Sequence, residues 1–116
     1  MPQFSLGKSF PGAGPMGPWV VSVDEFADPN DLALSTSIGG EVLQESRTSD
    51  LIFSVPALIE CLSGVTKLWP GDVIFTGTPA GVGIGRDPMR FLRAGEELVS
   101  EIEGIGSMVT TFTGGH

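Results

Sequence analysis

The 116-residue sequence has few of the residues that cross-link chains or bind nucleic acid. It contains one cysteine, so no disulfide can form within the chain, as is usual in a reducing compartment. Six residues are Lys or Arg and 14 are Asp or Glu, and the resulting net charge of −8 argues against nucleic acid as a partner. The sequence also lacks any apolar run of about 18 residues and the order of a signal peptide. We therefore expect a soluble, cytoplasmic protein without a membrane partner.

Glycine and proline, by contrast, are abundant. Seventeen glycines and nine prolines, with a hydrophobic fraction of 41%, are typical of short apolar strands that are joined by many turns. The length is sufficient for one hydrophobic core and not for two. The sequence therefore predicts one unit that is mostly β.

Strands are predicted where β-forming apolar residues alternate with polar ones or follow a turn. Gly39-Gly40 separates two such segments and is typical of a two-residue hairpin turn, because glycine readily adopts the positive φ that these turns require. A second turn is predicted at residues 104–106. The predicted strands are 19–23, 32–37, 41–45, 98–103 and 108–112.

One α-helix is predicted, at about residues 54–64. Ser54 can cap its first turn, Pro56 is tolerated there because the first N–H groups have no partners, and Gly64 is the predicted end. Apolar residues recur at near-helical spacing, so we expect one face to pack on the rest of the chain. These residues are Val55, Leu58, Ile59, Leu62 and Val65.

The strongest candidate for a binding site is WPGDVIFTGTPAGVGIG, residues 69–85. Residues 73–75 follow a turn and are predicted to form a buried strand. The loop after it has two hydroxyls and several glycines, so its backbone can approach a ligand and present N–H groups. Such a loop suits an anionic or carbonyl-bearing small molecule, and the alternative is a glycine-rich turn without a ligand. A phosphate-binding loop is excluded because no lysine follows Lys67 and the glycines do not match GxGxxG.

Three other features are weaker candidates. Lys8, on a loop predicted for residues 1–18, can be partly desolvated between apolar neighbours, although such a lysine more often extends into solvent. Glu101 and Glu103 could hold a divalent cation with a third ligand, but a solvated strand face is the preferred interpretation. Cys61 is predicted to be a small buried hydrophobe, because the one histidine, His116, lies on the terminal tail and cannot activate it.

Taken together, five ordered blocks resemble the C-terminal part of the fumarylacetoacetate hydrolase family. Members of this family are metal-dependent enzymes that cleave or isomerise β-diketo acids and related compounds from aromatic catabolism. The resemblance covers nearly the whole chain and implies a mixed β-sandwich or roll that is incomplete, with residues 1–18 as an active-site loop and residues 19–116 as a β core with the helix. The blocks are LGKSF (6–10), GPWVV (17–21), TSDLIFSVPALIECLS (48–63), PGDVIFTGTPAGVG (70–83) and EIEGIG (101–106).

The resemblance also implies roles for individual residues. Lys8 matches the catalytic lysine that holds a substrate oxygen and stabilises charge as the C–C bond breaks. Thr78 matches the threonine that binds a substrate carboxylate or carbonyl, Gly77 lets the backbone approach, and Thr76 shares this substrate-binding loop. The family's metal ligands and its water-activating His-Glu pair lie upstream of the LGKSF block. Mg²⁺ or another divalent cation is therefore implied, but none of its ligands is assigned to this chain.

The expected function is thus part of a metal-dependent hydrolase or isomerase that acts on acylpyruvate-like diacids, in a homodimer. The chain alone is expected to be inactive. Two alternatives stay open. One is a catalytically inactive truncated fragment, or a module used only for association, and the other is a decarboxylase or lyase of the same family.

Overall fold

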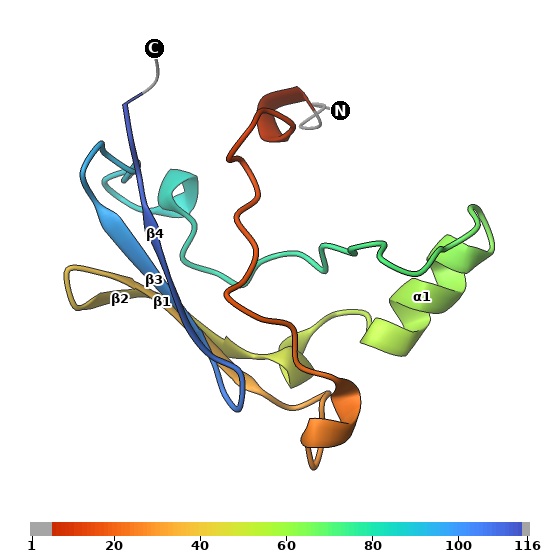
Figure 1. Cartoon of the computed structure of the whole chain (residues 1–116). Helices are drawn as coiled ribbons and strands as arrows, with labels where there is room; N and C mark the ends of the chain where they lie inside the picture. The colour runs from red at the N-terminus through yellow and green to blue at the C-terminus, as the bar shows by residue number, and fades with distance from the viewer. Residues whose placement is uncertain (1–5, 115–116) are drawn as a thin grey trace.

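The computed structural model describes residues 6–114 and contains one antiparallel sheet (Figure 1). Its strands are β1 (Ala33–Ile38), β2 (Glu41–Arg47), β3 (Glu97–Ile102) and β4 (Gly106–Thr111). The order in the sheet is β2-β1-β3-β4, and every neighbouring pair is antiparallel. Two hairpins therefore pair through their first strands. This arrangement confirms the mostly β prediction; residues 1–5 and the tail with His116 lie outside the described residues.

The β1–β2 hairpin forms as the sequence predicts. Gly39 and Gly40 have φ values of 58° and 83°, so both turn residues are in the left-handed region that favours glycine. The β3–β4 hairpin turns at Gly104, where φ is 74°. Local turn chemistry thus sets the register next to each turn, and in the first hairpin the register then shifts between Thr36 and Ser37.

Helix α1 (Val55–Ser63) also matches its prediction. The Ser54 hydroxyl oxygen accepts a hydrogen bond from the Ala57 N–H over 3.4 Å, and the Gly64 N–H donates to the Glu60 carbonyl over 3.2 Å. Both ends of the helix are therefore set by residues that its sequence provides. Four single 3₁₀ turns accompany it among the described residues, at Leu6–Lys8, Val23–Glu25, Thr48–Asp50 and Gly83–Gly85.

Two predicted strands are absent from the described residues. Residues 19–22 are extended without strand pairing before the 3₁₀ turn, and residues 73–75 form no strand, with Val73 54% and Phe75 85% exposed. A strand needs a neighbouring edge with free N–H and C=O groups. The outer edge of β2 contacts residues 78–86 instead, and residues 15–18 lie along β4. The apolar β-formers of residues 19–22 and 73–75 therefore lie outside the hydrogen-bonded ladder of the sheet.

The chain is open rather than compact. Ile38, 9% exposed, is the one buried residue among residues 6–114. The accessible surface is 9355 Å², whereas a compact monomer of 12.1 kDa exposes about 6,000 Å². The radius of gyration of 15.6 Å likewise exceeds the roughly 13 Å of a compact domain of this length. Much of the apolar surface thus remains in contact with solvent.

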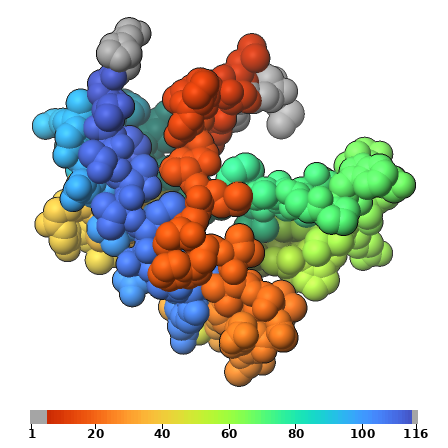
Figure 2. All heavy atoms as spheres, in the orientation of Figure 1, coloured from red at the N-terminus to blue at the C-terminus, as the bar shows by residue number. Residues whose placement is uncertain are grey.

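Helix α1 shows this openness most clearly. In Figure 2 the helix and the segment after it form an arm that extends away from the sheet. Val55, Ile59 and Leu62 are 38%, 43% and 36% exposed, and Cys61 is exposed too. The predictions of a packed helix face and of a buried cysteine are therefore wrong, because no other element of the described chain covers this helix. No described helix has the length and apolar character that crossing a membrane requires.

Candidate functional site

The loop that contains Thr78 is attached to the outer edge of β2. The Gln44 side chain donates from Nε2 to Thr78 Oγ1 over 2.8 Å and to the Pro79 carbonyl oxygen over 2.9 Å. One strand residue therefore holds two consecutive loop residues. Gln44 pairs with Thr36 of β1, next to a register shift at which Leu43 has no partner, so this attachment fixes the loop to the sheet beside a β-bulge.

The glycines of this loop have two different roles. A Cβ atom on Gly81 would collide with the Leu43 carbonyl oxygen, and one on Gly83 would collide with the Arg90 carbonyl oxygen. At these two positions the close approach is to the chain's own backbone rather than to a ligand. Gly77 differs, since its φ of 103° favours glycine while the space around it is open.

Arg86 completes the attachment. Its Nε donates to the Gly81 carbonyl over 3.0 Å, and its terminal nitrogen donates to the Leu43 carbonyl over 2.6 Å. The planar guanidinium can bind both acceptors at once because its donors point in fixed, divergent directions. The start and the end of the loop are thus both held against β2.

The predicted site residues all lie at the surface. Thr76, Gly77 and Thr78 are exposed on the loop. Lys8 is exposed at the end of its 3₁₀ turn, and its ammonium makes no hydrogen bond or ion pair with any residue from 6 to 114. Each of these groups is therefore accessible to a ligand.

The N-terminal loop and the Thr78 loop meet at one point. A Cβ on Gly14 would lie 3.7 Å from the ring of Phe75, the residue just before Thr76. Trp19 anchors the same N-terminal segment to the sheet, because its Nε1 donates to the Ile105 carbonyl over 2.7 Å. The structure thus brings residue 14 of the N-terminal loop close to the residue before Thr76, and Lys8 and Thr78 share no hydrogen bond.

The acidic residues do not form a metal site. Glu103 accepts a hydrogen bond from the Ala33 N–H over 2.9 Å and pairs with Arg47 at 3.4 Å, while Glu101 is exposed. No group of three or more His, Cys, Asp or Glu residues suited to a metal occurs between residues 6 and 114. A hard divalent cation normally takes about six oxygen ligands. The described residues therefore do not fit the Mg²⁺ or other divalent cation that the sequence implies.

Arg47 instead organises an ion-pair network at the end of the β1–β2 hairpin. Its Nε contacts Asp31 Oδ1 at 2.6 Å, and the Ser49 hydroxyl donates to the same oxygen over 2.7 Å. These hydrogen bonds hold the pKa of Asp31 below its ordinary value, with the charge of Arg47 acting in the same direction. The network links the end of β2 to Asp31 and Ser49 and is exposed to solvent.

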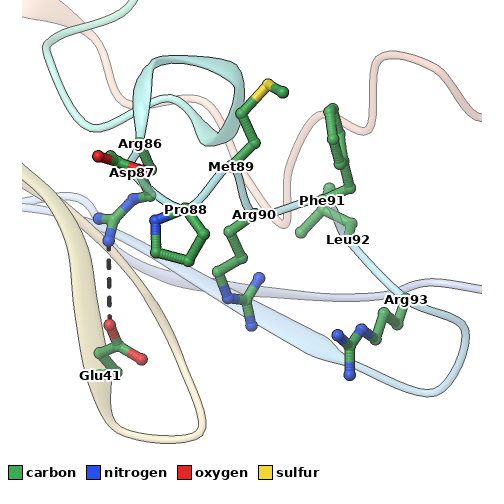
Figure 3. Close-up of a pocket in the computed structure, with 9 residues that line it drawn as sticks. All are labelled: Glu41, Arg86, Asp87, Pro88, Met89, Arg90, Phe91, Leu92 and Arg93. Atoms are coloured by element: carbon green, nitrogen blue, oxygen red, sulfur yellow. Dashed lines mark ion pairs between the residues drawn. The ribbon is translucent and has the colours of Figure 1, made fainter.

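A cavity of about 510 Å³ lies beside Arg86, between Glu41 of β2 and residues 87–93 (Figure 3). Two of its three arginines are paired, Arg86 with Glu41 at 3.9 Å and Arg90 with Glu96 at 2.9 Å. None of the predicted site residues lines it. The lining residues are Glu41, Arg86, Asp87, Pro88, Met89, Arg90, Phe91, Leu92 and Arg93.

Gln44 and Arg86 are the site residues that the sequence did not reveal. Gln44 is distant from the loop in sequence, and Arg86 comes after the loop's glycines. Neither residue belongs to a local motif that predicts a binding role. A glutamine between Leu43 and Glu45 is ordinary on a half-exposed strand. Only the position of the loop beside β2 gives these residues a role.

Comparison with known proteins identifies the family. Residues 1–113 match the family described as "Fumarylacetoacetate (FAA) hydrolase C-terminal". The chain is 43% identical over 107 residues to the mitochondrial oxaloacetate tautomerase FAHD2A of Bos taurus, a match that covers 92% of this chain and 34% of that protein.

Solved structures agree with this match. A Mycobacterium smegmatis protein described as HpcE is 56% identical, with a TM-score of 0.94 over 97% of this chain and 42% of that one. The maleylpyruvate hydrolase of Sphingobium sp. SYK-6, in complex with manganese(II) and pyruvate, is 32% identical, with a TM-score of 0.78 over 86% of this chain and 35% of that one. The chain spans about a third of the length of the curated relatives that it matches.

Proposed function

Because the chain belongs to the fumarylacetoacetate hydrolase family, we propose that residues 6–18 and 76–83 form part of the substrate site of a hydrolase or isomerase. The proposed substrates are β-diketo acids and acylpyruvate-like diacids of aromatic catabolism. Residues 1–116 are proposed to be the C-terminal part of the catalytic domain. A cytoplasmic location stays a prediction from the composition, and a homodimer stays a prediction from the family resemblance.

One observation carries this proposal. The Thr78 hydroxyl is exposed on a loop that two side chains hold against strand β2, so a polar group is presented to solvent in a fixed position. Fixed polar groups at the surface of a rigid sheet are typical of binding sites. The contact between Gly14 and Phe75 brings the loop that follows Lys8 to the same region.

The chemistry of the named residues suits an anionic substrate. The Lys8 ammonium is proposed to bind a substrate oxygen and to stabilise the negative charge that an enolate acquires when a β-diketone is cleaved or isomerised. Thr78 is proposed to donate a hydrogen bond to a carboxylate or carbonyl oxygen, and the Gly77 backbone leaves room for the ligand. The Sphingobium relative holds manganese and pyruvate. A divalent cation, bound by ligands outside the described residues, would stabilise the same negative charge.

A second candidate function is association without catalysis. The observation in its favour is the open apolar surface, which includes the exposed face of α1 and an accessible area well above that of a compact monomer. Exposed apolar surface of this extent is typical of chains that pack against a partner. This role and the substrate site do not exclude each other.

Binding of pyruvate to the 116-residue chain tests the substrate site. In a titration followed by nuclear magnetic resonance, we expect saturable shifts of the amide signals of residues 76–83. Lys8→Ala and Thr78→Ala should weaken binding, whereas Lys67→Ala and Thr66→Ala, which remove the same groups from an exposed segment elsewhere, should not. Equal binding by all four variants would contradict the proposal.

A further inference from the structure

The amide of Gln44 links both strands of the first hairpin to the Thr78 loop. The Thr36 hydroxyl on β1 donates to Gln44 Oε1 over 3.2 Å. From β2, Gln44 Nε2 then donates to Thr78 Oγ1 over 2.8 Å and to the Pro79 carbonyl oxygen over 2.9 Å. A continuous chain of hydrogen bonds therefore runs from the centre of the sheet to the loop.

The partners fix which way the Gln44 amide points. A carbonyl oxygen such as that of Pro79 only accepts hydrogen bonds, so the amide nitrogen must face the loop. This nitrogen has two hydrogens, of which one is used by Pro79 and the other by Thr78. Thr78 Oγ1 is thus an acceptor in this contact.

The hydroxyl hydrogen of Thr78 is consequently left to bind something else. A hydroxyl group has one hydrogen to donate, and Gln44 uses one of the two lone pairs of its oxygen without using that hydrogen. Within residues 6–114 this hydrogen has no acceptor. A hydroxyl whose oxygen accepts a hydrogen bond is also a stronger donor, because hydrogen bonds in a chain polarise one another.

We propose that Gln44 is a positioning residue that makes the Thr78 hydroxyl a hydrogen-bond donor toward a carboxylate or enolate oxygen of the substrate. This inference rests on the proposed function, since it requires that Thr78 contact the ligand. Gln44 itself does not touch the substrate. By donating to Thr78 Oγ1, it leaves the hydroxyl hydrogen available to the substrate, and by donating to the Pro79 carbonyl it holds the loop in position.

Gln44→Glu provides the sharpest test, because the two side chains have the same shape but a carboxylate only accepts. The Thr78 hydroxyl would then donate to the introduced carboxylate instead of the ligand, and pyruvate binding should weaken roughly tenfold, as for the loss of a hydrogen bond to a charged group. Affinity should partly recover as the pH falls through the ordinary glutamic acid pKa of about 4.3, because the protonated carboxyl can donate again. The parent chain should lack this pH dependence.

Val42→Glu is the matched control. It places the same carboxylate on β2, at a side chain that is 54% exposed, and it should bind pyruvate about as well as the parent at every pH. Loss of pyruvate binding in Thr78→Ala together with parent-like binding in Gln44→Glu would overturn this inference and leave the proposed function intact. If Thr78→Ala binds like the parent, both fail.

A measurement on the unsubstituted chain avoids any question of folding. In this chain both Gln44 side-chain amide protons should show shifted resonances and slow exchange with solvent. A comparison with Thr78→Val assigns them, because this variant should change one of the two signals and not the other. Two freely exchanging amide protons in the parent chain would contradict the inference without any substitution.

Discussion

The Arg86 guanidinium donates a hydrogen bond to the Leu43 carbonyl oxygen over 2.6 Å and so occupies the edge of β2 that no strand covers. The same side chain donates to Gly81, whose backbone lies against the same carbonyl. A charged side chain thus satisfies one carbonyl of this edge that no strand partner satisfies. Charged side chains at sheet edges are one of the ways in which proteins disfavour further strand pairing.

Replacing Arg86 should therefore loosen the loop. We expect Arg86→Met to lower the free energy of unfolding by about 1–3 kcal/mol, because it leaves carbonyl acceptors without the charged donor that satisfied them. Arg93→Met is the control, since the Arg93 guanidinium has no partner among the described residues, and it should change stability by about 0.5 kcal/mol or less. Urea denaturation of the two variants, followed by circular dichroism, gives the comparison, and equal losses would contradict this account.

Two glycines at the end of the loop provide a steric test. Gly83→Ala should destabilise by about 1–3 kcal/mol or more, because its Cβ would collide with the Arg90 carbonyl oxygen. Gly85→Ala adds the same methyl group where the nearest atom is a Val82 methyl at 3.6 Å, an ordinary contact. Neither glycine has a positive φ, so backbone strain does not distinguish them. In thermal unfolding, the midpoint temperature of Gly83→Ala should be well below that of Gly85→Ala. The reverse order would show that the loop does not lie as described.

The pKa of Asp31 predicts a dependence of stability on pH. Hydrogen bonds from Arg47 and Ser49 hold the folded-state pKa of this carboxyl below the ordinary value of 3.8. Its contribution is therefore fully present above that value and is lost as the pH falls through the lowered folded-state pKa. In Asp31→Asn, stability between neutral and acidic pH should fall less than in the parent. Parallel curves for the two proteins in acid denaturation would exclude this role for Asp31.

The N-terminal cap of α1 gives a test that is independent of the site. Ser54→Ala removes the oxygen that accepts from the Ala57 N–H and should cost about 1 kcal/mol of helix stability. Ser54→Asp keeps an acceptor and adds a favourable charge at the helix N-terminus, so it should retain the parent's helix content. Amide exchange of the first helical turn measures the effect directly. Equal protection in Ser54→Ala and in the parent would mean that water satisfies this turn as well as the hydroxyl does.

Catalysis by the chain alone is the last test. We expect the purified 116-residue chain to bind Mg²⁺ or Mn²⁺ weakly and to show no hydrolysis of acylpyruvate, because its described residues include no group of three metal-binding side chains. Isothermal calorimetry and a spectrophotometric assay check both statements. Robust turnover that EDTA abolishes would contradict them and direct attention to the carboxylates of Asp72, Asp87, Glu101 and Glu103.

The parts of the fold that the sequence predicts are those decided by neighbouring residues. The Gly39-Gly40 turn and the Ser54 cap are local devices, and both lie where they are predicted. Burial is different, because it depends on what covers a surface. Residues 73–75 have the composition of a buried strand, but they pair with no strand of the sheet, and the apolar face of α1 has no cover among the described residues.

The candidate site likewise has features that neighbouring residues decide and features that depend on tertiary position. The loop with Thr78 is recognisable from its hydroxyls and glycines, and the need for glycine at residue 77 is seen in its φ of 103°. The roles of Gln44 and Arg86 depend on tertiary position and could not be predicted. Nor could the sequence distinguish Gly81, which approaches Leu43, from a glycine that makes room for a ligand.

The strand order β2-β1-β3-β4 has a consequence for how the chain folds. Each hairpin joins segments that are adjacent in sequence, so both can form within microseconds. Pairing of β1 with β3 must instead close the long connection of residues 48–96, which costs loop entropy before any contact compensates for it. The Thr78 loop lies inside this connection, and the hydrogen bonds from Gln44 to Thr78 and Pro79 divide it into shorter segments. Once formed, the contacts that shape the site also shorten the loop that pairing of β1 with β3 has to close.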